Sequence, residues 1–391
     1  MVITCDVAVV GAGYIGCSIA HSLCRAGLRT ALIDQGDVAA GASRANYGNV
    51  QVQDAELDHS LPLVTRGYAR FATLEAELGC SVGYRRLGSL LVIETESQWH
   101  TLAERLPRLH AVGIRAEMVQ AQQLRELEPM LDSSSVLGAC YHESEGQVYP
   151  FALMWGYVRR ALQMGLTLHT QTSVTALDLQ GGRVAGLHTS RGAISCPRVI
   201  LATGAWTPSL ARALGRNWSI QHVRGQALVT ERVNLALRNH IASAAFFEAT
   251  QVTQNEDGGH NAQAVLALSQ SAHGNFLLGE VAAVTTELDS HAIPSGISAI
   301  AAMTSRYFPM LKNARGLRTW VAPVAFTSDG MPYLGPVAGL PGLIVATAFK
   351  STVIVTPLVG ELVTQVVLGQ PTEIDLTPFS PDREIARTST G

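Results

Sequence analysis

The first stretch of apolar residues forms a β–α–β pattern. Residues 2–10 are rich in β-branched residues, which is typical of a buried strand, and an apolar run with helical character follows and ends near Leu23. A second apolar segment, 29–33, ends at Asp34. Between the first strand and the helix stands the sequence G-A-G-Y-I-G, residues 11–16. This order predicts a nucleotide-binding unit.

The glycine spacing has a physical reason. Gly11 permits a tight turn, Gly13 lets the backbone approach a pyrophosphate, and Gly16 lets the helix pack closely on the strand. The start of the helix then faces the phosphates. Asp34 ends the second strand, where a carboxylate can accept hydrogen bonds from the ribose of an adenine nucleotide. An arginine there would instead favour a 2′-phosphate.

The middle of the chain alternates between helical and strand-like patterns. A Gly/Ala/Ser/Asn-rich loop is expected at 36–52, and the segment 224–284 has the period-2 pattern of an antiparallel sheet. Helices are expected at 61–79, 96–112, 121–128, 150–164 and 294–307, and strands at 88–93, 166–170, 176–189 (a pair around the turn Gly181-Gly182) and 198–202.

The C-terminal part returns to the character of the nucleotide unit. A strand is expected at 343–347 and a loop at 348–355. Thr356 is then an expected N-cap, with Pro357 in the first helical position and Gly369 at the end of the helix.

Composition narrows the functional classes. The 391 residues are 47% hydrophobic and 15% charged, and 28 basic against 31 acidic residues leave a net charge of −3. No basic excess exists for nucleic acid or an anionic membrane. No apolar run reaches the ~20 residues of a membrane span, and no signal peptide is visible. The six cysteines form no C-x-x-C pair, so we expect no metal or iron–sulfur site in this chain, and a reducing, cytoplasmic location.

Three separate segments together resemble the FAD-dependent D-amino-acid oxidase superfamily, which includes glycine and sarcosine oxidases. They are the N-terminal glycine motif with its following loop, L-A-T-G-A-W at 201–206, and T-S-D-G-M-P-Y-L-G-P at 327–336 followed by A-T-A-F-K-S-T-V-I-V-T-P at 346–357. Within the superfamily, V-R-G-Q at 223–226 and N-F-L-L-G-E at 275–280 look most like catalytic flavoprotein subunits of heteromeric opine (octopine or nopaline) oxidases.

The resemblance implies a cofactor site, residue by residue. It implies that the pyrophosphate is bound by Gly11, Gly13, Ile15 and Gly16, and that the adenosine ribose is bound by Asp34 and Gln35. The remaining positions that it implies are Ser43, Arg44, Asn46, Gly48 and Asn49 beside the pyrophosphate and flavin edge, Val174 at the adenine, Thr203, Gly204 and Trp206 on the ribityl side, and Lys350, Ser351, Thr352 and Val353 facing the flavin pyrimidine. Core packing is the alternative for Trp206.

Two positions depart from the family pattern. Lys350 and Lys312 are the only lysines among 28 basic residues, and relatives commonly carry Gly or His at the position of Lys350. We therefore expect Lys350 to act on catalysis by stabilising the reduced flavin or by binding a second acceptor; an exposed surface lysine is the alternative. In the glycine oxidase pattern R-x-W-x-G-x-R, the last arginine holds the substrate carboxylate, and here Val324 takes its place. Arg224, Lys350 and the histidines are possible replacements.

The resemblance implies FAD-dependent oxidation of an amino-acid-type amine. Hydride would pass to flavin N5 and the imine would be hydrolysed, with opine cleavage to an amino acid and a 2-oxo acid as the leading substrate class. D-Hydroxyproline or proline dehydrogenation and glycine, sarcosine or D-amino-acid oxidation are alternatives, as is a non-catalytic FAD-binding subunit. A nicotinamide enzyme would leave the C-terminal motif without a role. The resemblance to heteromeric enzymes also implies partner subunits that take up the electrons. FMN or an iron–sulfur cluster would then be bound by a partner subunit or shared with it.

The expected fold is α/β. A Rossmann-like FAD-binding domain would be assembled from 1–84, 145–222 and 320–391. An inserted α+β substrate domain built on an antiparallel sheet would comprise 85–144 and 223–319. The flavin is expected between the two domains.

Overall fold

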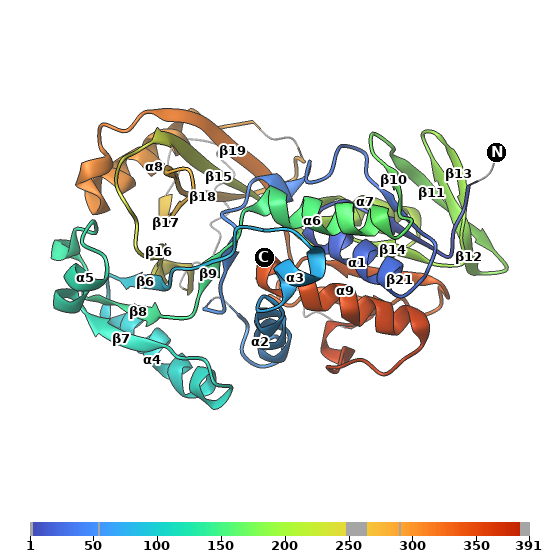
Figure 1. Ribbon diagram of the computed structural model, residues 1–391, viewed down its shortest axis with the longest axis horizontal. Helices are drawn as coiled ribbons and strands as arrows, with labels where there is room; N and C mark the ends of the chain where they lie inside the picture. The colour runs from blue at the N-terminus through green and yellow to red at the C-terminus, as the bar shows by residue number, and fades with distance from the viewer. Residues whose placement is uncertain (1–2, 54, 248–263, 289–290, 384–391) are drawn as a thin grey trace, which may run out of the picture.

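Two large sheets organise the protein. The computed structural model describes residues 3–53, 55–247, 264–288 and 291–383. Figure 1 shows the larger sheet with helices α4, α5 and α8 in one half of the molecule, and helices α1, α6 and α9 in the other half around the second sheet. The fold class is the expected α/β arrangement.

The second sheet has six strands in the order β10-β3-β2-β14-β21-β20. All neighbours pair in parallel except β20 with β21. Parallel order places the carboxyl ends of the strands at one edge, where nucleotides bind in such sheets. The strands are β2 (Val7–Val10), β3 (Thr30–Ile33), β10 (Thr167–His169), β14 (Val199–Leu201), β20 (Tyr333–Pro336) and β21 (Leu343–Thr347).

Three long helices cover this sheet. Helix α1 (Tyr14–Arg25) packs between α6 (Pro150–Gln163) and α9 (Thr352–Leu368), and α2 (Leu61–Arg70) packs on α9. The core is therefore built from both ends of the chain. The shorter helices here are α3 (Leu74–Leu78) and α7 (Thr207–Ala213).

The larger sheet has eight strands in the order β19-β15-β18-β17-β16-β6-β8-β7. It is antiparallel, as expected, except for the parallel pair β16–β6. Residues 248–263 of the predicted sheet segment lie outside the described residues. The strands are β6 (Ser89–Ile93), β7 (Glu117–Gln120), β8 (Gly138–His142), β15 (Gln221–Arg232), β16 (His240–Ser243), β17 (Ala264–Gln270), β18 (Asn275–Thr285) and β19 (Gly316–Phe326), and the helices beside them are α4 (Glu96–Ala111), α5 (Ala121–Leu127) and α8 (Pro294–Tyr307).

Two small sheets complete the fold. The order of the four-stranded one is β1-β13-β12-β11, and that of the three-stranded one is β4-β9-β5. The predicted turn Gly181-Gly182 joins β11 to β12, with positive φ at both glycines. The strands are β1 (Ile3–Thr4), β4 (Asn49–Val50), β5 (Arg85–Arg86), β9 (Gly146–Gln147), β11 (Val174–Gln180), β12 (Arg183–Thr189) and β13 (Gly192–Ser195).

Two predicted elements are each divided in the structure. The strand expected at 2–10 is broken at Asp6, whose carboxylate accepts hydrogen bonds from the backbone N–H and guanidinium of Arg29, so β1 and β2 join different sheets. The helix expected at 61–79 is broken after Arg70 by i→i−3 bonds. Phe71 and Leu74, at and after the break, are both buried in the core.

The start of α9 corrects another prediction. The helix begins at Thr352 with Ser351 as N-cap, and Pro357 lies inside it. Residues 353–355 are only 1–4% exposed, so burial favours a helix there despite the local signal of the proline. Gly67 of α2 lies so close to this turn that a Cβ on it would be 2.5 Å from the carbonyl oxygen of Ile354.

The division into two domains stays a prediction. Its three FAD-binding segments supply all strands of the six-stranded sheet. Strand β19 runs across the boundary placed at residue 320, and β15 begins before the boundary at 223. Among the described residues, no helix has the length and apolar character needed to cross a membrane.

Candidate functional site

The turn from β2 to α1 brings the backbone unusually close to its neighbours. Gly11 has φ +107°, and a Cβ on it would lie 2.3 Å from the carbonyl oxygen of Ala202. A Cβ on Gly16 would lie 1.7 Å from the carbonyl oxygen of Gly11. Both positions therefore require glycine, and together they let α1 begin directly at the end of β2.

The start of α1 is suited to an anion. Its N-cap is Gly13, no side chain caps it, and its first turn carries no acid. The Ser43 hydroxyl, from the short helix η1 (Ala42–Arg44), accepts a hydrogen bond from the Tyr14 N–H at 3.3 Å. Ile15 is buried and Arg44 exposed. Backbone N–H groups, a helix dipole and a nearby serine and arginine fit a pyrophosphate.

Asp34 is held in a fixed orientation beside this turn. Its carboxylate oxygens accept hydrogen bonds from the Ala12 and Gly36 N–H groups, both at 2.7 Å. Partial burial raises the pKa of this carboxyl above its usual value. The segment that precedes Val174 bonds back here, because the Thr172 N–H donates to the Asp34 carbonyl at 2.8 Å. The geometry thus brings Asp34, the exposed Gln35 and Val174 into one region, as an adenosine site requires.

The residues expected at the flavin lie around the other end of η1. Gly48 has φ +78°, and a Cβ on it would lie 2.1 Å from the Val148 carbonyl oxygen. The side chain of Asn46 accepts a hydrogen bond from the Gly48 N–H at 2.7 Å. The Trp206 ring packs against Gly41: a Cβ on Gly41 would lie 3.4 Å from a carbon of the ring. Gly48 is thus fixed by close packing, and Trp206 has the packing contact that was its alternative role.

The Thr203 segment is tied to strand β21 by hydroxyl groups. The Thr203 hydroxyl bonds that of Thr207 at 2.8 Å, and Thr207 bonds Thr347 at 3.1 Å. Gly204 follows with φ +51°. This chain of bonds fixes the loop after β14 against the loop that leads to Lys350.

The Lys350 segment differs from its expected form. Ser351, Thr352 and Val353 form the N-cap and first turn of α9 rather than a loop. Lys350 is exposed and borders a small cavity with Glu56 and Ser60, next to α2. No described residue forms an ion pair with its ammonium group. Its action on the flavin stays a prediction.

One face of the larger sheet turns toward η1 and Trp206. Trp320, Ala227 and Gly279 form a row across β19, β15 and β18, and Val324 lies on the same face of β19. Strand β19 contacts both η1 and the turn Gly204–Trp206. We call this face, defined by Trp320, Val324 and Gly279 with the neighbouring Gly225, the substrate face.

The substrate face has open space at its centre. A Cβ built on Gly225 would meet no atom within 4 Å. The Val324 side chain is half-buried and apolar, so it offers no clamp for a carboxylate. Arg224 points to the opposite face, where it contacts Thr285 and pairs with Glu287 at 3.0 Å. It is therefore not the replacement cation that the sequence allowed.

Sequence reasoning missed two polar residues at this face. A Cβ on Gly279 would lie 1.8 Å from the Tyr47 hydroxyl oxygen, and the Tyr47 and Trp320 rings are 6.2 Å apart. Glu280 occupies a bulge in β18, where the register shifts between Gln226 and Ala227. The only signal in the sequence was an acid that ends the apolar run F-L-L-G.

A buried polar network links the loop after η1 to the larger sheet. The Ser269 hydroxyl donates to Asn49 Oδ1 at 3.1 Å and lies 3.3 Å from His240 Nδ1, while His240 Nε2 bonds Gln51 at 2.8 Å. Burial lowers the pKa of His240 to about 3, which keeps the ring neutral. The network fixes Asn49 from the sheet side.

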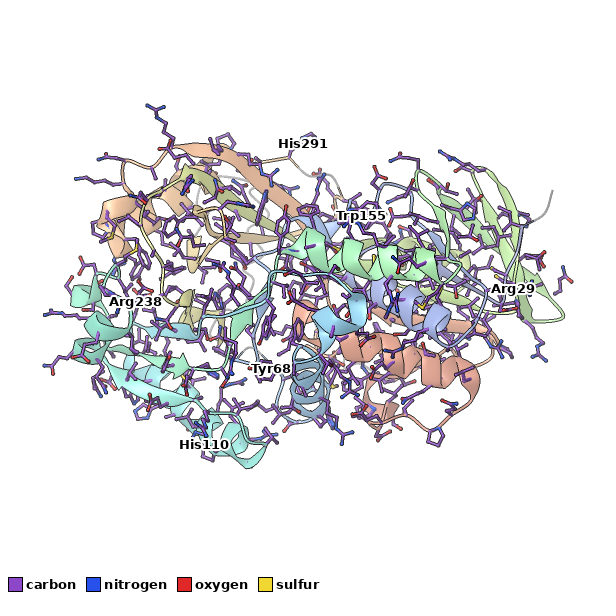
Figure 2. All side chains as sticks on the ribbon, viewed as in Figure 1. Arg29, Tyr68, His110, Trp155, Arg238 and His291 are labelled. Atoms are coloured by element: carbon purple, nitrogen blue, oxygen red, sulfur yellow. The ribbon has the colours of Figure 1, made fainter. Side chains whose placement is uncertain are left out.

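Next to this network the side chain of Glu145 fixes the segment after Gln51. Its carboxylate accepts hydrogen bonds from the Val52 and Gln53 N–H groups at 2.6 and 3.0 Å. Glu145 also lines a cavity of about 130 Å³ with His142 and Tyr68. Tyr68, labelled on α2 in Figure 2, donates its hydroxyl to the Ser144 carbonyl at 2.6 Å. Among the described residues, no cluster of His, Cys, Asp and Glu has the geometry of a metal site.

Comparisons with known proteins identify the family. A family described as FAD dependent oxidoreductase matches residues 6–366. Glycine oxidase from Geobacillus kaustophilus is 27% identical over 98% of both chains, and the solved structure of glycine oxidase from that organism superposes with a TM-score of 0.87, over 98% of this chain and 100% of that chain. A hydrogen cyanide synthase subunit from Pseudomonas aeruginosa is 26% identical over 96% of this chain and 95% of its own length.

Proposed function

Because the chain belongs to the family of FAD-dependent oxidoreductases, acting on amines like its glycine and sarcosine oxidase relatives, we propose that it oxidises secondary amines of the opine type. The products would be an amino acid and a 2-oxo acid. Bound FAD would supply the oxidant, taking the hydride from the carbon that bears the amine.

The observation that carries this proposal is Val324 on strand β19 of the substrate face. The glycine oxidase pattern places a carboxylate-binding arginine there, and an apolar side chain cannot replace its two charged hydrogen bonds. The open space over Gly225 leaves room for a second substituent on the amine nitrogen. A small primary amino acid would neither be clamped nor fill that space.

The residues of the chain divide the work. The β2–α1 turn, Ser43 and Asp34 would hold the dinucleotide, and the hydroxyl chain from Thr203 to Thr347 fixes the loops that would lie beside the flavin. Trp320 and Val324 would line the substrate face with an indole ring and an apolar side chain. Positioning and exclusion of water are the protein's main contributions in cofactor enzymes.

We further propose that the chain works as one subunit of a cytoplasmic heteromeric dehydrogenase. Support comes from its similarity to a hydrogen cyanide synthase subunit. Because the six cysteines contain no C-x-x-C pair, an FMN or iron–sulfur centre would belong to, or be shared with, the partner. Lys350, exposed beside the start of α9, is the residue we propose to tune the flavin or to meet the second acceptor.

Glycine oxidation is the second candidate, favoured by the full-length similarity to a glycine oxidase. Proline-type amines are tested alongside it.

The experiment is anaerobic bleaching of the bound flavin. The purified flavoprotein is mixed with octopine, nopaline, proline, hydroxyproline, sarcosine, glycine and D-alanine, with and without candidate partner subunits. Bleaching by an opine, with slow reoxidation in air, is the expected result. Bleaching by glycine or D-alanine instead would replace the opine proposal, and fast reoxidation with peroxide would remove the need for a partner.

A further inference from the structure

Glu280 is a carboxylate without a partner inside the substrate face. No described residue forms a hydrogen bond or an ion pair with it, whereas the buried or half-buried acids Asp34, Glu128 and Glu145 all accept hydrogen bonds from backbone N–H groups. Glu280 is half-buried, and a carboxylate that is partly withdrawn from water without a paired cation is a candidate to bind a cationic ligand.

The position of Glu280 follows from the bulge in β18. Gly279 pairs with Ala227 and Val281 pairs with Gln226, so Glu280 is the extra residue between two ladder positions. Bulges of this kind change the direction of a side chain and are frequent next to active sites. Val281 packs into the apolar core on the far side of the sheet, while Gly279 faces Tyr47 on the substrate face.

Two aromatic side chains with unsatisfied polar atoms lie on the same face, and Tyr47 contacts Gly279, the residue before Glu280. The Tyr47 hydroxyl and the Trp320 indole N–H are both buried, and neither has a hydrogen-bond partner among the described residues. Burial, and secondarily the negative charge of Glu280, raise the pKa of the Tyr47 phenol. An aromatic pair beside a carboxylate is a common surrounding for a cationic nitrogen.

Burial also acts on the carboxyl itself and raises the pKa of Glu280 to about 7. A cation bound beside it would reverse this effect by stabilising the carboxylate.

We propose that Glu280, with Tyr47 and Trp320, forms a subsite for a positively charged nitrogen of the substrate. This proposal deepens the proposed function and rests on it for the identity of the reaction. The charge on the face is then opposite to that of the glycine oxidase pattern, because Val324 stands in place of the arginine and the face carries the acid Glu280. Amines with a guanidinium or ammonium group fit such a face.

The first test measures binding and needs no turnover. Methylguanidinium and its neutral isostere N-methylurea are titrated into the FAD-loaded protein by calorimetry. We expect the cation to bind at least tenfold more tightly, and Glu280→Gln to abolish this preference. Glu287→Gln is the matched control: Glu287 is 69% exposed and pairs with Arg224 on the opposite face, so this variant should keep the preference. Equal binding of both probes to the wild type, or a preference that survives in Glu280→Gln, overturns the proposal.

The second test locates the nitrogen. Flavin bleaching is compared for secondary amines with a cationic side chain and with a neutral one. If Glu280 meets the side chain, Glu280→Gln raises KM tenfold or more for the cationic substrates alone. If it meets the reacting nitrogen, Glu280→Gln raises KM equally for the cationic and the neutral substrates. An unchanged KM for every amine that is oxidised overturns the subsite.

The two proposals fail separately. A wild type that prefers methylguanidinium through Glu280 but is bleached by no secondary amine would refute opine oxidation and leave the subsite standing. The retained flavin spectrum of Glu280→Gln shows that the variant is folded and loaded.

Discussion

Asp34 is the residue that we expect to bind the adenosine ribose, and hydrogen bonds from two backbone N–H groups fix its carboxylate at the turn after β2. Replacing Asp34 with Ala should weaken FAD binding about 10- to 100-fold, because charged hydrogen bonds contribute about 1.5–3 kcal/mol. Quenching of flavin fluorescence on titration measures this. The exposed Asp37, changed to Ala, should bind FAD as the wild type does; equal affinity of both variants would show that Asp34 does not touch the cofactor.

Gly225 permits a test of the substrate face at the same scale. Because a Cβ there meets nothing within 4 Å, Gly225→Val should fold and bind FAD normally while filling the open space. We expect KM for secondary amines to rise at least tenfold, with a smaller rise for Gly225→Ala. Steady-state kinetics would decide, and an unchanged KM in the valine variant would place the substrate elsewhere.

Among the elements, the contact between α2 and α9 depends on Gly67. A Cβ there would lie 2.5 Å from the Ile354 carbonyl oxygen. Overpacking costs about 1–3 kcal/mol, whereas the helix propensity gained from Gly to Ala is about 1 kcal/mol. Gly67→Ala should therefore lower the free energy of unfolding by up to about 2 kcal/mol, measured by urea titration. Gly225→Ala, which adds the same methyl group to open space, should change it little, and equal stability of the two variants would contradict this reading of the contact.

Elements whose pattern is local could be predicted from the sequence, and those set by distant packing could not. The β2–α1–β3 unit and helix α8 follow the periodicity of their own residues. The predicted start of α9 was wrong because burial of residues 353–355 places them in the helix, and no local pattern shows this burial. Glu280 was missed because its bulge exists only in the pairing of β18 with β15. The bond between Gln51 and His240 likewise joins residues that no local pattern connects.

The whole molecule should lose stability in mild acid. Burial lowers the pKa of His21 and His142 to about 4 and that of His240 to about 3, all below the ordinary value of 6.5. Between about pH 6.5 and 4 the unfolded chain therefore binds protons that the folded chain does not, and stability falls as the pH falls, by up to about 1.4 kcal/mol per pH unit for each histidine.

Glu280 has a raised pKa, so its protonation stabilises the folded protein as the pH falls and opposes the effect of the histidines. A variant of a single histidine therefore isolates that histidine's contribution. Urea unfolding at pH 6.5, 5.5 and 4.5 should show a smaller pH slope for His240→Gln than for the wild type. Parallel curves would mean that His240 is protonated in the folded protein.

The order of the strands in the smaller of the two large sheets also governs how the protein can be made. Strand β2 pairs with β14, β14 pairs with β21, and α1 packs on α9. The packing of the first elements of the chain is therefore complete only when residues beyond 340 are present. We therefore expect the six-stranded sheet to close only when nearly the whole polypeptide has been made, and FAD to bind late. A nascent chain stalled before β21 would expose an apolar strand edge of β14.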